Sequence, residues 1–229
     1  MKIGDVELVI VEDANEVATL TANRLASAAR AGGSIVLTGG RTPKQAYEEA
    51  ARAEADWSKV ELWWGDERCV PPDDDNSNYG MAKNALLDNL GRAPAVVHRI
   101  KGELGKEDAA AEYARELGET KLGLLLLGIG PDGHVASLFP NEATLERQER
   151  VLPAEARLEP FVDRVTLSLP TLRGAAEILF VVAGADKADA VRRAFVEDPG
   201  PPTPASLVRA ESGRTTAILD RAAAAELEG

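Results

Sequence analysis

The chain contains few of the residues that build disulfide-linked proteins and metal sites. Only one of its 229 residues is cysteine, and two are histidine. A single cysteine excludes an intrachain disulfide and favours a reducing compartment, so we expect a cytoplasmic protein. Because His98 and His134 stand far apart in the sequence, we expect no histidine pair that binds a metal.

Long apolar runs and excess positive charge are also missing. No run approaches the about 20 apolar residues of a membrane-spanning helix, and the first residues, MKIGDVELVIVEDANEV, meet acidic side chains too early for a signal peptide. The formal net charge of −12 argues against nucleic acid or an anionic membrane as partner. An anionic small molecule stays compatible with this charge, because a few local cations are enough to hold a phosphate.

Three segments, 34–38, 122–128 and 177–183, are nearly continuous runs of Leu, Ile and Val. Such runs are typical of strands buried on both faces. Helical patterns alternate with them, which predicts one α/β domain over residues 1–229, with a mostly parallel sheet and helices on both faces. Further strands are expected at 6–11, 60–67 and 214–220, an extended segment at 163–172, and helices at 14–32, 42–54, 79–91, 105–118, 186–197 and in the tail after 220.

Glycines and hydroxyls follow the first buried strand, in the stretch LTGGRTP. Thr42 is expected to cap the next helix, with Pro43 as its first residue. Thr38, Gly39, Gly40, Arg41 and Thr42 then surround a helix N-terminus, where free N–H groups favour an anion. A tight turn with a satisfied cap explains the same residues, and this segment alone leaves both interpretations open.

Charged residues follow the strand at 60–64, where Asp66, Glu67 and Arg68 come in succession. Two acids beside a cation at a strand end suit a site that orients a sugar and holds negative charge. A solvated loop with a surface ion pair is the alternative. The nearby acidic run at 73–75 does not fit a calcium-binding loop, because glycine and glutamate are missing from the required positions.

The third strand end reads GIGPDGHVASLFP. Its glycines match G-x-G-x-x-G, but Pro140 leaves no room for the long helix that a dinucleotide site needs. His134 is expected near the start of a short helix, as a neutral base, with Asp132 orienting its ring or opposing that effect. A capping aspartate and a hydrogen-bonded loop histidine are the alternative.

Lys187 is expected in the first turn of the helix after the strand at 177–183. The helix dipole makes that a poor place for a cation, and a bound phosphate would relieve the conflict. An exposed lysine in water explains it equally. For His98 we favour a structural role over a contact with substrate.

Together, LTGGRTP, WWGDERCVPPDDDNSN, GIGPDGHVASLFP, RVTLSLPTL and GADKA resemble the 6-phosphogluconolactonases, in the same order and over residues 34–196. The resemblance implies a Rossmann-like fold and hydrolysis of 6-phospho-D-glucono-1,5-lactone in the pentose phosphate pathway, with no cofactor and no required metal. It implies that His134 is the general base, that Asp132 orients it or binds the sugar, and that Arg68 stabilises charge on the carbonyl oxygen. Gly39, Gly40, Thr42 and Lys187 would hold the phosphate.

The wider superfamily includes sugar-phosphate deaminases and isomerases, which are the closest alternative. Those enzymes resemble the present chain at Asp66 but carry polar residues where it has Leu138 and Phe139. A sugar-phosphate sensor without activity would keep the phosphate turn but has no need for Asp132 and His134. Arg41 departs from the serine that is common in the family, so its role stays open. The sequence does not fix the oligomeric state, and we favour a monomer.

Overall fold

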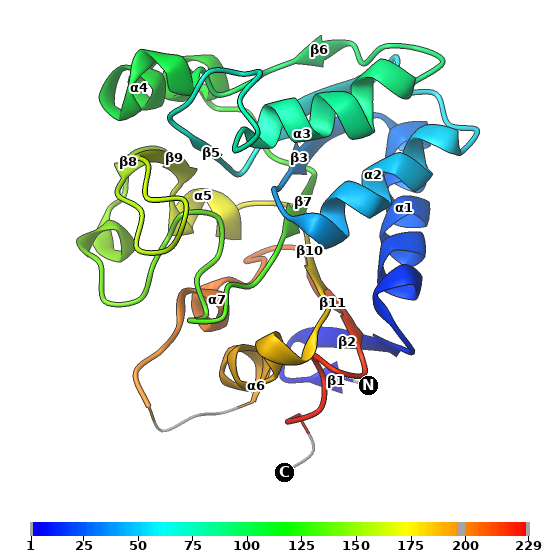
Figure 1. The fold of residues 1–229 in the computed structure, drawn as a ribbon, viewed down its shortest axis with the longest axis vertical. Coiled ribbons are helices and arrows are strands. Elements are labelled where there is room, and N and C mark those ends of the chain that lie inside the picture. Colours follow the sequence, from blue (N-terminus) through cyan, green and yellow to red (C-terminus); the bar gives the residue numbers. More distant parts are fainter. Residues whose placement is uncertain (1, 197–199, 228–229) are drawn as a thin grey trace.

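The computed structural model describes residues 2–196 and 200–227 and contains an eight-stranded sheet (Figure 1). Every neighbouring pair in this sheet is parallel except β1 with β2, where only described residues are counted. In spatial order the strands are β1 (Lys2–Ile3), β2 (Val6–Val11), β11 (Arg214–Asp220), β10 (Glu177–Val182), β7 (Leu124–Leu127), β3 (Gly33–Leu37), β4 (Val60–Trp64) and β6 (Val96–Val97).

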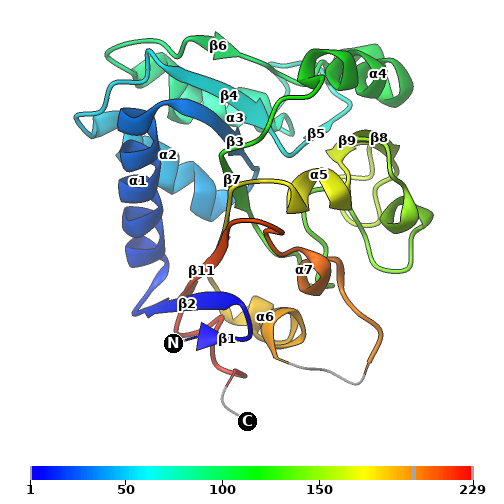
Figure 2. The ribbon, with the colours of Figure 1, turned by 180° about the vertical axis from the view of Figure 1, so that it is seen from behind.

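Helices cover both faces of this sheet, so the predicted fold class is confirmed. Helices α1 (Ala14–Ala31) and α2 (Arg41–Arg52) lie on one face, and α5 (Leu169–Arg173) and α7 (Pro204–Leu207) lie on the other (Figures 1 and 2). The remaining helices are α3 (Asn78–Ala85), α4 (Lys106–Leu117) and α6 (Ala188–Phe195). Strand β7 consists of four buried leucines at the centre of the sheet, which is why its sequence shows no alternation.

A second, antiparallel sheet of three short strands was not predicted. It consists of β5 (Asp66–Arg68), β9 (Arg164–Leu167) and β8 (Val151–Ala154). The expected single strand at 60–67 divides at Gly65. The N–H of Gly65 donates to Leu37 O of β3 at 3.0 Å, and its carbonyl accepts from Leu167 N of β9 at 2.8 Å. Gly65 therefore joins the two sheets.

Other segments also differ from the prediction. The expected extended segment at 163–172 is β9 followed by α5, because the Ser168 side chain caps a short helix with Pro170 in its first turn. The expected helix at 79–91 ends at Ala85 and continues as a short 3-10 turn. Residues 221–227 form turns, so a helical tail is wrong for them. The last residue of the expected helix at 186–197 lies outside the described residues.

Among the described residues, no helix is both long and apolar enough to cross a membrane.

Two buried tyrosines fix the ends of neighbouring strands. The Tyr47 hydroxyl accepts from Thr38 N at 2.9 Å and donates to Thr38 O at 2.8 Å, just beyond β3. The Tyr113 hydroxyl does the same for Trp64, the last residue of β4, at 2.8 and 3.0 Å. Backbone groups left over where strand pairing stops are thereby satisfied without water. Both strand ends are held rigidly below the pocket.

Candidate active site

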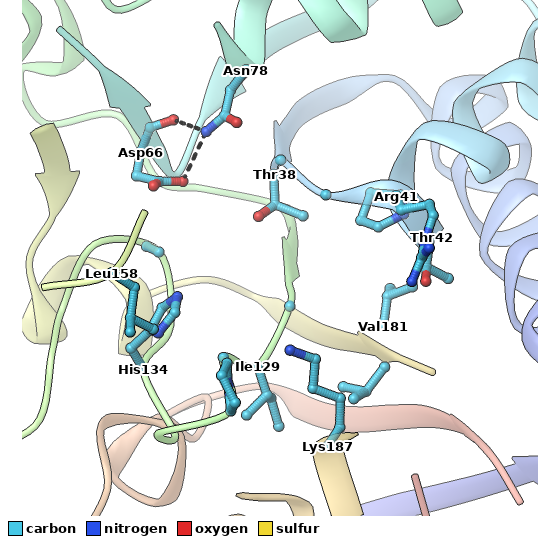
Figure 3. A pocket seen from close by; sticks show the side chains of 18 of the residues that line it. Thr38, Arg41, Thr42, Asp66, Asn78, Ile129, His134, Leu158, Val181 and Lys187 are labelled. Atoms are coloured by element: carbon cyan, nitrogen blue, oxygen red, sulfur yellow. Dashed lines mark hydrogen bonds between the residues drawn. The ribbon is translucent and has the colours of Figure 1, made fainter. Parts of the chain in front are cut away.

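A pocket of about 480 Å³ lies at the carboxyl ends of β10, β7, β3 and β4, which are neighbours in the large sheet. In open α/β sheets this edge is where ligands bind. Figure 3 shows Arg41 and Thr42 at one side of the pocket, His134 and Asp66 at the other, and Thr38 and Lys187 between them. Nine of the ten predicted site residues line it: Thr38, Gly39, Gly40, Arg41, Thr42, Asp66, Arg68, His134 and Lys187.

Helix α2 opens one end of the pocket, and it begins one residue earlier than predicted. Gly40 is the N-cap, with φ of 113°, so Thr42 and Pro43 are the second and third helical residues and the expected Thr42 cap is wrong. No side chain caps this helix. Its first N–H groups therefore remain available to a ligand, next to the Thr42 hydroxyl. Together with the helix dipole they form a site that favours an anion.

Lys187 approaches the same region from β10. It is the last residue of a 3-10 turn (Ala185–Lys187) and directly precedes α6, so it lies just before the helix instead of within its first turn. Its Nζ points into the pocket (Figure 3) and lies 3.3 Å from Asp186 Oδ2. The turn is held from behind, because both carboxylate oxygens of buried Asp220 accept from Gly184 N.

Asp66 is a buried carboxylate that connects three segments of the site. Its Oδ2 accepts from Ser137 Oγ at 2.7 Å, and its Oδ1 accepts from Asn78 Nδ2 at 3.2 Å. Asn78 also packs against Gly39, where a Cβ would lie 2.0 Å from Asn78 Oδ1. Glycine at position 39 is thus required for this close approach. Through Ser137 and Asn78, Asp66 fixes the loop of His134 relative to the glycine turn after β3.

Arg68 brings a cation to the pocket from the small sheet. Its Nη1 donates to Asn76 O at 2.8 Å, whereas its buried Nε has no partner among the described residues. The preceding Glu67 does not line the pocket, and its carboxylate accepts from the backbone N–H groups of Arg68, Asn78 and Tyr79. Burial raises the pKa of Glu67 against the effect of these hydrogen bonds. The Glu67 carboxylate therefore binds backbone N–H groups, whereas the Arg68 side chain lines the pocket.

His134 and Asp132 form a direct contact across one glycine. His134 Nδ1 lies 2.6 Å from Asp132 Oδ1, which also accepts from His134 N at 3.1 Å. Burial raises the pKa of Asp132, but the His134 hydrogen bonds and charge outweigh it and leave this pKa below its usual value. An ionised Asp132 favours the proton on Nδ1, and in the neutral ring this tautomer leaves the lone pair on Nε2. Asp132 itself does not line the pocket, and it contacts the site through the His134 ring.

The segment around His134 is a series of turns, so the predicted short helix is wrong. Gly133, with φ of 87°, and Ala136, with φ of 49°, adopt left-handed conformations that interrupt a helix. The His134 ring lies against the backbone of Gly130, where a Cβ would be 2.0 Å from ring Nδ1 and Cε1. The orientation of the His134 ring is therefore set by turn geometry, and His134 does not stand at the start of a helix.

Residues that the sequence did not indicate complete the pocket: Asn78, Leu158 and Glu159 line it, and Ser137 and Arg164 hold its walls. Asn78 and Ser137 belong to the quoted motifs, but nothing in their spacing shows which atoms they contact. His98 lies elsewhere. Its ring stacks on Trp63 at 3.7 Å, and Nδ1 lies 2.6 Å from Glu116 Oε1, in agreement with a structural role.

Comparison with known proteins gives a consistent result. A model of the family described as glucosamine-6-phosphate isomerases/6-phosphogluconolactonase matches residues 10–217. The 6-phosphogluconolactonase of Streptomyces coelicolor is 38% identical over 96% of this chain and 94% of its own, and the human one is 37% identical over 90% and 86%. The crystal structure of 6-phosphogluconolactonase from Thermotoga maritima is 30% identical, with a TM-score of 0.81 over 94% of this chain and 99% of that one. The chain belongs to the glucosamine-6-phosphate isomerase/6-phosphogluconolactonase family.

Proposed function

We propose that this chain is a cytoplasmic enzyme of the pentose phosphate pathway that hydrolyses 6-phospho-D-glucono-1,5-lactone to 6-phosphogluconate as a monomer, with His134 as general base. The observation that carries the mechanism is the 2.6 Å contact of Asp132 with His134 in the wall of a pocket whose other end is an uncapped helix N-terminus. Relatives named 6-phosphogluconolactonase support the reaction.

The hydrolysis follows from the groups on the two sides of the pocket. Nε2 of His134 takes a proton from a water molecule as the water oxygen attacks C1 of the lactone. Negative charge then develops on the former carbonyl oxygen, and the Arg68 guanidinium stabilises it. When the C1–O5 bond breaks, the imidazolium returns its proton to O5, and Asp132 stabilises the imidazolium in between. Acid and alcohol are released in one ring-opened product.

The phosphate is held at the other end. The first N–H groups of α2, the hydroxyls of Thr38 and Thr42, and the Lys187 ammonium supply donors and positive charge there. Gly39 and Gly40 give the backbone room to approach the phosphate, and Arg41 adds a second cation at the rim. Asp66, on the side of His134, is placed to bind a sugar hydroxyl. With the phosphate bound at one end of the pocket and the sugar hydroxyl at the other, the lactone carbonyl is oriented toward His134.

Hydrolysis is favoured over the deaminase or isomerase alternative by what surrounds His134. Leu138 and Phe139 are buried, and Phe139 packs against the His134 ring with centroids 4.8 Å apart. An apolar neighbour supplies no second acid for proton transfer between C1 and C2. Attack by water on an ester needs one base, one stabiliser of charge and one anchor. A non-catalytic sensor has no need of a base oriented by a carboxylate.

The direct test uses fresh substrate. The lactone is generated in the cuvette and formation of 6-phosphogluconate is followed with and without the pure protein. We expect the protein to raise the rate well above the spontaneous one, since a base and an oxyanion stabiliser each accelerate such reactions by about a hundredfold or more. Equal rates with and without protein would exclude lactonase activity.

Replacing Lys187 tests the phosphate anchor. Lys187→Ala is expected to weaken binding of 6-phosphogluconate by about 10- to 150-fold, because a charge-assisted hydrogen bond contributes on the order of 1.5–3 kcal/mol. Lys44→Ala on the exposed side of α2 is the matched control and should bind as the wild type does. Titration calorimetry measures both. If Lys187→Ala bound 6-phosphogluconate as tightly as the wild type, the phosphate would have to bind away from Lys187.

A further inference from the structure

Arg164 is a buried cation that no step of the mechanism above uses. It lies in β9 of the small sheet and is 4% exposed. Among the described residues it forms no ion pair. Its guanidinium donates instead to backbone carbonyls: Nε to Val162 O at 3.1 Å, and Nη2 to Pro160 O at 2.9 Å, with a longer contact to Leu158 O at 3.5 Å. All three carbonyls belong to residues 158–162, which we call the wall segment.

The wall segment forms part of the pocket but has little structure of its own. Leu158 and Glu159 line the pocket, and Figure 3 shows Leu158 on the same side as His134. The segment contains neither helix nor strand, and Phe161 is 71% exposed, so apolar packing does not anchor it there. Within the segment, Val162 N donates to Pro160 O at 2.8 Å. The hydrogen bonds from Arg164 are therefore a major constraint on its position.

The location of Arg164 lowers the stability of the folded chain. It is paired in register with Arg68 across β5 and β9, and like charges directly opposite each other destabilise a sheet. Burial, and then the charge of Arg68, lower the pKa of Arg164, although Asp66 and Glu67 oppose this. Burying a cation without a paired carboxylate is costly. Local rules of this kind are broken mainly where function requires it.

We propose that Arg164 is a positioning residue for the lactone hydrolysis, acting through the wall segment. By holding the carbonyls of residues 158–162 it fixes Leu158 and Glu159 as the pocket wall on the side of the base. The wall places the sugar ring against His134 and limits the water around the imidazole. Arg164 touches neither substrate nor base in this arrangement. The inference rests on the proposed lactonase activity.

The main test replaces Arg164 by lysine. Arg164→Lys keeps the charge but replaces a planar, five-donor fork by a single ammonium, which cannot hold several carbonyls in the same way. We expect KM for the freshly generated lactone to rise on the order of tenfold, with a smaller change in kcat and an unchanged pH profile of kcat, because His134 and Asp132 are untouched. Amide exchange in residues 158–162 should become faster.

The matched control is Arg150→Lys. Arg150 also donates to backbone carbonyls, those of Gly118 and Thr120, but these lie away from the pocket. This variant should lose thermal stability and leave KM and kcat per folded molecule unchanged. If Arg164→Lys behaves in the same way, losing stability with normal KM, Arg164 is only structural and the proposal is overturned.

A second variant keeps the test independent of folding. Leu158→Ala leaves Arg164 in place and removes the wall side chain, so it should reproduce the rise in KM, and a normal KM overturns the proposal. Failure of the lactonase proposal is recognised separately, because the wild type itself would then show no hydrolysis. In that case affinity for 6-phosphogluconate replaces KM, and Arg164→Lys binding as tightly as the wild type overturns the inference.

Discussion

His134→Ala is expected to lower kcat for the lactone by at least about a hundredfold, which is the usual scale for losing a general base. The alanine variant retains Arg68 and the phosphate anchor, so it should still bind 6-phosphogluconate with nearly normal affinity. Turnover is measured with lactone generated in the cuvette, and binding is measured by calorimetry. Deletion of a base that acts mainly during the reaction separates these two quantities.

Asp132→Asn is the companion variant. The amide keeps the size of the side chain and can still accept from His134 Nδ1, but it carries no charge to stabilise the imidazolium. We expect a kcat between those of the wild type and His134→Ala. Turnover of His134→Ala close to that of the wild type would remove the imidazole from the mechanism, whatever Asp132→Asn does.

Gly130→Ala is expected to slow the reaction strongly without removing any of the proposed catalytic groups. A Cβ at this position would lie 2.0 Å from Nδ1 and Cε1 of His134, closer than atoms approach, so the ring has to move. A displacement of about 1 Å can cost on the order of a hundredfold in rate. The movement also disturbs the 2.6 Å contact with Asp132. We expect kcat to fall by tenfold to about a hundredfold.

Gly91→Ala is the control for this substitution. A Cβ at Gly91 meets no atom within 4 Å, and its φ is not in the left-handed region. It should therefore preserve activity and thermal stability. A structure of the Gly130→Ala variant with the His134 ring unmoved, or full activity of that variant, would show that the backbone of Gly130 does not set the position of the base.

The large sheet can be predicted from the sequence because each of its central strands is marked by its own run of apolar residues. The runs of Leu, Ile and Val in β3, β7 and β10 reflect burial on both faces, a property that each strand carries by itself. Since parallel strands share one carboxyl edge, the residues that follow them meet there, as the pocket confirms. The contact of Asp132 with His134 is equally local, because a single glycine separates them.

The small sheet and the pocket walls were not predictable in this way. Strands β5 and β9 have three and four residues, too few for a pattern, and their register pairs Asp66 with Thr166, a hundred positions apart. Asn78 gains its role from a contact with the backbone of Asp66, twelve positions away. Arg164 gains its role from nearby carbonyls, but in a segment with neither helix nor strand, where no sequence pattern indicates the contact. The short helix predicted at His134 is wrong for a different reason. Ala136 has a left-handed φ, and an alanine in the sequence gives no indication of such a conformation.

Gly65 has a consequence for how the catalytic groups are kept at working distance. The proposed base and phosphate anchor follow strands of the large sheet, whereas Arg68, the proposed stabiliser of charge, stands on the small one. Between the two sheets, this one residue donates its N–H to β3 and accepts with its carbonyl from β9. The distance between His134 and Arg68 is thus set by the position of the small sheet relative to the large one. The proposed catalysis therefore depends on the alignment of the large sheet with the small one, and Gly65 is hydrogen-bonded to both.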